Sequence, residues 1–307
     1  MKKMKIKTAV ILLTFFFMIA CSSEENKISD DKLVVVSTIN IINDMVKHIG
    51  GDKVEARSIC GVGIDPHTYK SVPGDSRIIA SADVVFMNGF GLEGWITKLI
   101  SAAGVNKPVF IVTDGIKPLK DESGHGDPDP HCWFNAQLAK DYVDNILFGL
   151  IEVDSENADY YSETAEAYKL QLDSLHTFAL DMISGIPRER RILVTSHDAF
   201  RYFGEAYGIR VEALQGISTE AKAQTADVAA LVDLIKEYNL PAVFIETSVN
   251  PKLLEQIASE TQAKIGGVLY SDSIDEEGTP GGTFIGAFKH NVVTITNALK
   301  ENAEVKK

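Results

Sequence analysis

One long helical stripe in the middle of the chain separates two series of short apolar runs. Its seven apolar residues, spaced alternately four and three apart, are Tyr161, Ala165, Tyr168, Leu172, Leu175, Ala179 and Met182. This spacing is typical of one face of a helix. Asp154 or Ser155 can cap its start, and Gly185 and Pro187 can stop it. The length, about seven turns, exceeds that of a typical helix. We therefore expect a rigid connector between two lobes, the alternative being another sheet-covering helix in a single large domain.

Strand-like and helix-like segments alternate on both sides of this connector. Strands are expected at 33–37, 54–58, 84–87 and 109–112, and again at 192–196, 211–214, 243–245 and 264–269. Helices are expected at 39–49, 93–102, 135–153, 225–238 and 251–261, with Gly50 stopping the first. Such alternation indicates βαβ units and parallel sheets. The expected fold class is α/β, with two Rossmann-like lobes joined by a single long connector helix.

The first twenty residues have the pattern of a secretory signal peptide. Four lysines precede an apolar run over 8–20, which is shorter than the roughly 20 residues that span a bilayer. The run ends in Met18-Ile19-Ala20-Cys21, which resembles a bacterial lipobox. We expect cleavage before Cys21 and lipidation of this residue, giving a stable membrane anchor. The alternative is an ordinary signal peptide with an incidental cysteine.

These patterns predict five segments along the chain. They are a signal peptide at 1–20, a lipidated tether at 21–32, an N-terminal α/β lobe at 33–153, the connector at 154–186 and a C-terminal α/β lobe at 187–307. The formal net charge is −13, and loss of the four leader lysines brings it near −17. An acidic chain of this kind argues against nucleic acid or anionic lipid as a partner.

Cys60 and Cys132 remain as thiols after lipidation of Cys21. An extracytoplasmic location permits a disulfide between them, and metal ligation is a further alternative. Because the sequence does not set the distance between them, we favour two buried or loosely paired thiols.

The tripeptide Asp-Pro-His occurs twice, ending at His67 and at His131. Proline restricts its own φ and disfavours helical geometry in the residue before it. A neutral imidazole is the commonest protein metal ligand, and a stiff loop loses little entropy when it binds one. The repeated tripeptide therefore predicts a metal site assembled from distant parts of the chain.

Ligands of open parallel sheets bind beyond the carboxyl ends of the strands. Four candidates follow expected strands in this way, namely His67, His131, His197 and Asp272. Three imidazoles and a carboxylate make a tetrahedral set for Zn²⁺, or a five-coordinate one if Asp272 binds through both oxygens. At equal availability such a site favours Zn²⁺ over Mn²⁺. Taken alone, His197 could be a hydrogen-bonded histidine and Asp272 could cap a turn.

Three more acidic residues are candidates for a supporting role. Asp65 and Asp129 precede the two histidines by two residues, where they can shape the loop or accept a hydrogen bond from the imidazole. Glu246 follows the expected strand at 243–245 and is a competing ligand or a supporting acid.

Several segments resemble the signatures of one family, the metal-binding receptors of ABC importers, also called TroA-like or zinc/manganese solute-binding proteins. The segments are 63–69 (GIDPHTY), 129–133 (DPHCW), 195–200 (TSHDAF), 215–219 (QGIST) and 270–272 (YSD). The resemblance implies two α/β lobes, one long helix and a single metal buried between the lobes. His67, His131, His197 and Asp272 match the family's ligand positions. Histidine at the third position resembles the zinc or dual zinc/manganese branch, whereas zinc-dedicated members often carry a His-rich loop where this chain has only His125.

The resemblance implies a binding protein and not an enzyme. It would capture one Zn²⁺ or Mn²⁺ ion per chain and deliver it to an ABC permease with its ATPase. We expect a monomer anchored by its lipid in the cell envelope, facing the periplasm or the exterior. One alternative is a secreted zinc-dependent hydrolase, although the chain has neither a His-Glu-x-x-His pair nor a serine nucleophile elbow. Another is a surface adhesin or metal scavenger.

Overall fold

The computed structural model describes residues 32–120 and 128–300, which belong to one compact unit. The expected signal peptide, Cys21, the tether up to residue 31 and His125 lie outside the described residues. Within the described ranges, no helix combines the length and apolar character needed to cross a membrane.

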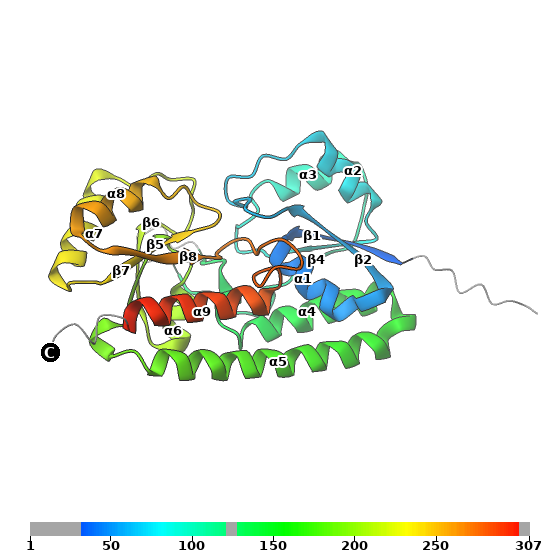
Figure 1. Ribbon diagram of the computed structural model, residues 1–307. Coiled ribbons are helices and arrows are strands. Elements are labelled where there is room, and N and C mark those ends of the chain that lie inside the picture. The colour runs from blue at the N-terminus through cyan, green and yellow to red at the C-terminus, as the bar shows by residue number, and fades with distance from the viewer. Residues whose placement is uncertain (1–31, 121–127, 301–307) are drawn as a thin grey trace, which may run out of the picture. The chain divides into compact units, whose positions relative to one another are not determined.

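The first half of the described chain is built on a four-stranded parallel sheet (Figure 1). Its strands, in the spatial order β2-β1-β3-β4, are β1 (Leu33–Ile39), β2 (Val54–Cys60), β3 (Val84–Met87) and β4 (Val109–Ile111). The helices of this half are α1 (Asn40–Gly50), α2 (Pro73–Ser81), α3 (Ile96–Ala103) and α4 (Ala139–Val153). Valines favour β1 because branched side chains suit a pleated surface. Val35 belongs to the core shared with α1 and α4, and Val36 to the core shared with α2 and α3, so helices cover both faces.

The second half repeats this plan with two pairs of parallel strands. They are β5 (Ile192–His197) with β6 (Arg210–Gln215), and β7 (Ala242–Glu246) with β8 (Lys264–Leu269). Strand β5 also contacts β7. The helices are α6 (Arg201–Tyr207), α7 (Thr225–Glu237), α8 (Lys252–Thr261) and α9 (Phe284–Lys300). Helices α7 and α8 pack in one core and α6 and α9 in the other. Short 3-10 turns occupy 51–53, 132–134, 155–157 and 188–190.

Helix α5 (Ala158–Ser184) is the predicted connector, and it contacts helices from both halves. Figure 1 shows it running beneath α4 and α9, with β1–β4 and β5–β8 toward opposite ends. The predicted α/β fold with parallel strands and one long helix is confirmed.

Details at the helix ends differ from the predictions. The buried stripe of α5 ends at Ile183, not at Met182, which is half-buried. The reason is that a strict four-three repeat averages 3.5 residues, whereas a straight helix needs 3.6 per turn. The prediction that Asp154 or Ser155 caps α5 is also wrong: Asn157 is the N-cap, and Asp154 accepts hydrogen bonds from its amide at 2.8 Å and from the Tyr161 hydroxyl at 2.6 Å.

One glycine boundary shifts by a residue. Gly50 belongs to α1, and the residue that ends the helix is Gly51, whose φ of 52° suits a residue without a Cβ.

Candidate metal centre

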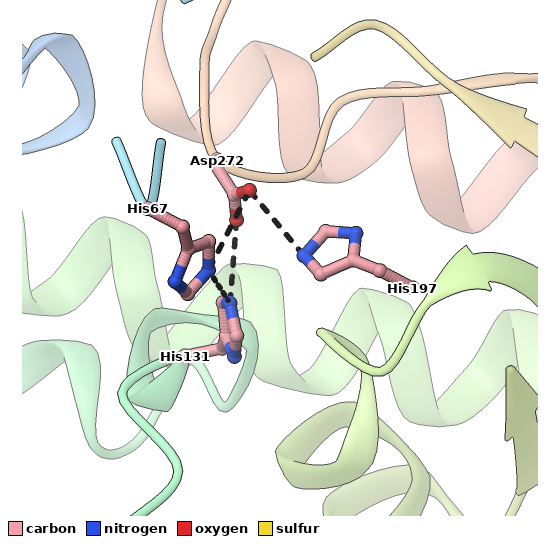
Figure 2. A group of neighbouring side chains, drawn as sticks. All are labelled: His67, His131, His197 and Asp272. Atoms are coloured by element: carbon pink, nitrogen blue, oxygen red, sulfur yellow. Dashed lines mark hydrogen bonds and ion pairs between the residues drawn. The ribbon is translucent and has the colours of Figure 1, made fainter. Parts of the chain in front are cut away.

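Four side chains from separate parts of the chain converge in one buried group (Figure 2). The group consists of His67, His131, His197 and Asp272, the residues expected to be ligands. One potential ligand atom from each lies within 4.8 Å of those of the other three. His67 is 9% exposed, and the other three residues are 1% exposed or less.

The parallel strands explain why these residues meet. His67 lies in the segment after β2, and His131 lies in the segment after β4. His197 is the last residue of β5, and Asp272 is the third residue after β8. All four therefore lie at or beyond the carboxyl ends of strands, the side on which ligands of α/β sheets bind.

The ligand atoms are spaced as one small ion requires. The Nε2 atoms of His67 and His131 are 3.2 Å apart. Asp272 places Oδ1 3.4 Å from Nε2 of His131 and Oδ2 3.3 Å from Nε2 of His197. A tetrahedral ion bound at about 2.05 Å separates two nitrogen ligands by about 3.3 Å. Asp272 Oδ2 is farther from Nε2 of His67, at 4.0 Å. The group is able to hold one metal ion.

His131 is oriented by the aspartate of its own tripeptide. Oδ1 of Asp129 accepts hydrogen bonds from Nδ1 of the imidazole at 2.8 Å and from the backbone N–H of His131 at 3.0 Å. Both residues are fully buried. The hydrogen bond at Nδ1 leaves Nε2 facing the other ligands, as Figure 2 shows. Outer carboxylates commonly orient metal-binding imidazoles in this way.

Glu246 occupies a similar place behind His197. Its Oε1 accepts the backbone N–H of His197 at 2.9 Å, and its Oε2 lies 2.5 Å from Nδ1 of the imidazole. Glu246 is the last residue of β7 and is 3% exposed. Its position behind the imidazole supports a role as a supporting acid.

Asp65 acts differently from Asp129, although both occupy the first position of the tripeptide. Its Oδ1 accepts the backbone N–H of His67 at 2.9 Å. Its Oδ2 accepts the hydroxyls of Thr68 at 2.9 Å and of Thr219, from the segment after β6, at 2.6 Å. Of the two roles expected for Asp65, the structure shows loop shaping.

Asp272 lies in a segment that is attached to the start of α1. The carboxamide of Asn40 accepts the N–H of Ile274 at 3.1 Å and donates to its carbonyl oxygen at 3.0 Å. Ser273 Oγ accepts Nδ2 of Asn40 at 3.0 Å and the N–H of Gly63 at 2.8 Å. The sequence offers no signal for these contacts, which join residues more than 200 positions apart.

Charge and burial act against each other throughout the group. Burial lowers the pKa of His67 to about 4, although the charge of Asp272 opposes this shift. For His131, burial lowers the pKa, but hydrogen bonds to Asp129 and Asp272 outweigh burial and raise it to about 9. For His197, burial is likewise outweighed by the charges of Glu246 and Asp272, so its pKa is well above the ordinary value.

The neighbouring histidines favour the ionised, carboxylate form of Asp272. Burial raises its pKa, but the charges and hydrogen bonds of His197 and His131 outweigh burial and hold the pKa well below the ordinary value. Positive charge on these two imidazoles thus favours the ionised form of the carboxylate.

Cys60 and Cys132 are free and buried. Burial raises the pKa of the Cys132 thiol to about 12 and also raises that of the Cys60 thiol. Neither is in the metal group, so the expectation of two buried thiols agrees with the structure.

Comparisons with known proteins give the same picture. The family model described as zinc-uptake complex component A periplasmic matches residues 35–298. The manganese-binding lipoprotein MntA of Bacillus subtilis (strain 168) is 39% identical over 300 residues, which cover 95% of this chain and 98% of that protein. The manganese ABC transporter substrate-binding lipoprotein PsaA of Streptococcus pneumoniae is 34% identical over 310 residues, which cover 98% of this chain and 100% of that protein.

A solved structure shares both the fold and the sequence. The periplasmic zinc binding protein TroA from Treponema pallidum matches with a TM-score of 0.84 and 35% identity, covering 88% of this chain and 99% of that chain. These likenesses confirm the resemblance found in the sequence, and they set aside the hydrolase alternative because the relatives are binding proteins of transporters, not enzymes. The chain belongs to the zinc-uptake complex component A periplasmic family.

Proposed function

We propose that this protein captures one divalent transition-metal ion, Zn²⁺ or Mn²⁺, and passes it to an ABC permease for import. The ligands would be the Nε2 atoms of His67, His131 and His197 and the carboxylate of Asp272. The single observation that carries the proposal is the convergence of these four buried side chains within 4.8 Å. Three of the measured spacings, from 3.2 to 3.4 Å, fit one tetrahedral ion.

The arrangement favours holding an ion over using it in catalysis. A catalytic zinc site commonly has three protein ligands and an open position for water. Here four candidate protein ligands converge, and Asp129 and Glu246 lie behind two of the imidazoles, which supports a closed site. A site closed by protein ligands suits transport of the ion as cargo.

The choice between Zn²⁺ and Mn²⁺ rests on opposing arguments. Three imidazoles favour Zn²⁺ by the Irving–Williams order. MntA and PsaA, however, are named for manganese, and TroA is named for zinc. We propose that the site accepts both ions and that availability decides which one is carried.

Delivery requires that the two halves of the site separate. We propose lobes at 33–153 and 187–307, with the connector at 154–186, so that His67 and His131 come from one lobe and His197 and Asp272 from the other. A lipid on Cys21 would keep the monomer at the membrane beside its permease and ATPase. MntA and PsaA are named lipoproteins, which supports this location.

The test is metal stoichiometry in the soluble chain that begins after Cys21. Elemental analysis after purification, followed by titration of the metal-free protein with Zn²⁺ and Mn²⁺, should show one ion per chain. His197→Ala should lose most of this binding, because it removes a fully buried ligand. His48→Ala is the matched control, since it removes an exposed histidine that is outside the group.

Two results would contradict the proposal. The first is a wild-type protein without stoichiometric binding of either ion. The second is a His197→Ala protein that is folded and binds as tightly as wild type.

A further inference from the structure

Both Asp-Pro-His loops are held by one short segment, the turn Asn88–Trp95, which follows β3. The indole Nε1 of Trp95 donates a hydrogen bond to the carbonyl oxygen of Pro66 at 2.9 Å. Nδ2 of Asn88 donates to the carbonyl oxygen of Pro130 at 2.9 Å. Each proline immediately precedes a metal-group histidine, so one turn contacts both loops at the same point of the repeated tripeptide.

These bonds complete the restraint of two peptide planes. A carbonyl oxygen and the N–H of the next residue belong to one planar unit. In the Pro66–His67 unit, the oxygen is held by Trp95, and the N–H is held by Asp65. The peptide that enters His67 is therefore fixed from both sides.

The Pro130–His131 unit is restrained in the same manner. Its oxygen is held by Asn88, and its N–H is held by Asp129. With φ of the proline also restricted, the Cα position of each histidine has little freedom. The φ of each histidine and its two side-chain torsions then place the imidazole, and for His131 the hydrogen bond from Nδ1 to Asp129 restrains the ring as well.

The turn itself is rigid. Gly89, Phe90 and Gly91 all have positive φ, of 92°, 50° and 83°. A Cβ at Gly89 would lie 2.6 Å from Cγ2 of Ile111 and 2.8 Å from Oγ1 of Thr113, so the segment packs closely against the end of β4. Three successive left-handed residues are unusual and need support from their surroundings.

A buried glutamate supplies that support. The carboxyl group of Glu93, which is 3% exposed, accepts the N–H of Asn88 at 2.6 Å and of Gly89 at 3.1 Å. It also accepts the hydroxyl of Thr38 at 2.6 Å. The side chain of Asn88 is fixed in turn, because its Oδ1 accepts the hydroxyl of Tyr142 at 2.7 Å. Its amide group is thereby directed at Pro130.

We propose that Asn88 and Trp95 are positioning residues that set the separation of His67 and His131 through the carbonyl groups of Pro66 and Pro130. The two imidazoles, with Nε2 atoms 3.2 Å apart, then form a preassembled half of the site before metal arrives. This inference rests on the proposed function, and it assigns a binding role to residues that touch no ligand atom.

Trp95→Phe tests the proposal. It removes the indole N–H but keeps an aromatic ring beside Tyr69, whose ring centroid is 5.0 Å from that of Trp95. We expect metal affinity to fall about tenfold or more, as for other outer-sphere contacts of metal sites. The visible absorption of bound Co²⁺ should also change, which a general loss of stability would not cause.

Tyr161→Phe is the matched control. It removes a hydroxyl that bonds Asp154 at 2.6 Å at the start of α5, again leaving an aromatic ring in place. Both variants should lower the melting temperature of the metal-free protein by a comparable amount. Only Trp95→Phe should alter metal affinity and the Co²⁺ spectrum.

A double-mutant comparison shows through which ligand Trp95 acts. In a His67→Ala background the effect of Trp95→Phe on Zn²⁺ affinity should disappear, and in a His131→Ala background it should persist. Asn88→Ser should show the reverse pattern. If Trp95→Phe does not yield folded protein, Asn88→Ser carries the test.

The outcomes separate this inference from the proposed function. If wild type binds one ion and a folded Trp95→Phe protein binds it with the same affinity and Co²⁺ spectrum, the positioning role is wrong and the metal site stands. If wild type binds no stoichiometric metal, the proposed function itself fails.

Discussion

Oδ1 of Asp129 accepts hydrogen bonds from both the backbone N–H and the Nδ1 atom of His131, at 3.0 and 2.8 Å. The first copy of the tripeptide lacks this arrangement, because Asp65 bonds the backbone N–H of His67 and then the hydroxyl of Thr219. The two copies therefore give their histidines unequal support. His131 is locked by a carboxylate, and His67 is the more exposed of the two.

This difference predicts that Asp129→Asn weakens metal binding. The substitution keeps the shape of the side chain and removes the charge that raises the basicity of the imidazole. We expect the dissociation constant for Zn²⁺ to rise about 10- to 100-fold, measured by competition with a chromogenic chelator. Asp144→Asn is the control, since Asp144 of α4 pairs with Lys169 of α5 and is outside the metal group. An Asp129→Asn protein with unchanged affinity would contradict this role.

The contact between Asn40 and Ile274 predicts an effect on the rate of metal release. Asn40→Ala removes both hydrogen bonds to Ile274 and the bond to Ser273, so the segment that carries Asp272 should loosen. We expect faster dissociation in stopped-flow experiments with excess chelator. Asn297→Ala removes an exposed carboxamide of α9 and should leave the rate unchanged. Equal rates for Asn40→Ala and wild type would show that the segment is held by other contacts.

Metal affinity should fall as the pH is lowered. The pKa of His131 is raised to about 9 and that of His197 is raised well above its ordinary value, so both shifts favour the protonated imidazole when no metal is bound. Binding must displace a proton from each, and each displaced proton changes the dissociation constant by about tenfold per pH unit. Metal affinity should therefore decrease as the pH is lowered from about 9, the pKa of His131 in the metal-free protein.

Calorimetry in two buffers of different ionisation enthalpy measures these protons directly. We expect about two protons released per ion at pH 7. An affinity that stays constant down to about pH 5, with no buffer dependence, would contradict the proposed imidazole ligands.

The stripe on α5 predicts a stability difference between two leucines on one helix. Leu172 is fully buried and Leu170 is 68% exposed. Leu172→Ala should lower the free energy of unfolding by about 2–5 kcal/mol because it leaves a cavity, whereas Leu170→Ala should change it by about 0.5 kcal/mol or less. Urea unfolding of the metal-free variants measures both values. Similar values for the two would mean that α5 does not pack along this face.

Local patterns in the sequence predicted most of the strands and the connector. Strands β3 and β8 begin and end where expected, because their apolar runs are bounded by polar residues or turns. Helices α2 and α6, of nine and seven residues, were not predicted, since short helices show too few repeats of an apolar face. Caps depend on side-chain geometry at single residues, and those of α1 and α5 were placed wrongly for this reason.

The four candidate ligands, which the structure brings together, could be chosen from the sequence because they follow strands and carry recognisable chemistry. The residues that support the two Asp-Pro-His loops could not be predicted in this way. Asn88, Glu93 and Trp95 act through hydrogen bonds to residues 29 to 55 positions away, and a single sequence does not encode such distances. One signal was present, because the segment from Asn88 to Glu93 directly follows β3 at the same carboxyl edge as the ligands. The rule that selected His197 and Asp272 selects this turn as well.

The most direct test of the central claim is a crystal structure of the metal-loaded protein with anomalous scattering recorded at the Zn or Mn edge. We expect one anomalous peak, about 2.0–2.2 Å from Nε2 of His67, His131 and His197 and from a carboxylate oxygen of Asp272. A peak at any other position, or a loaded protein in which one of these side chains points away from the ion, would contradict it.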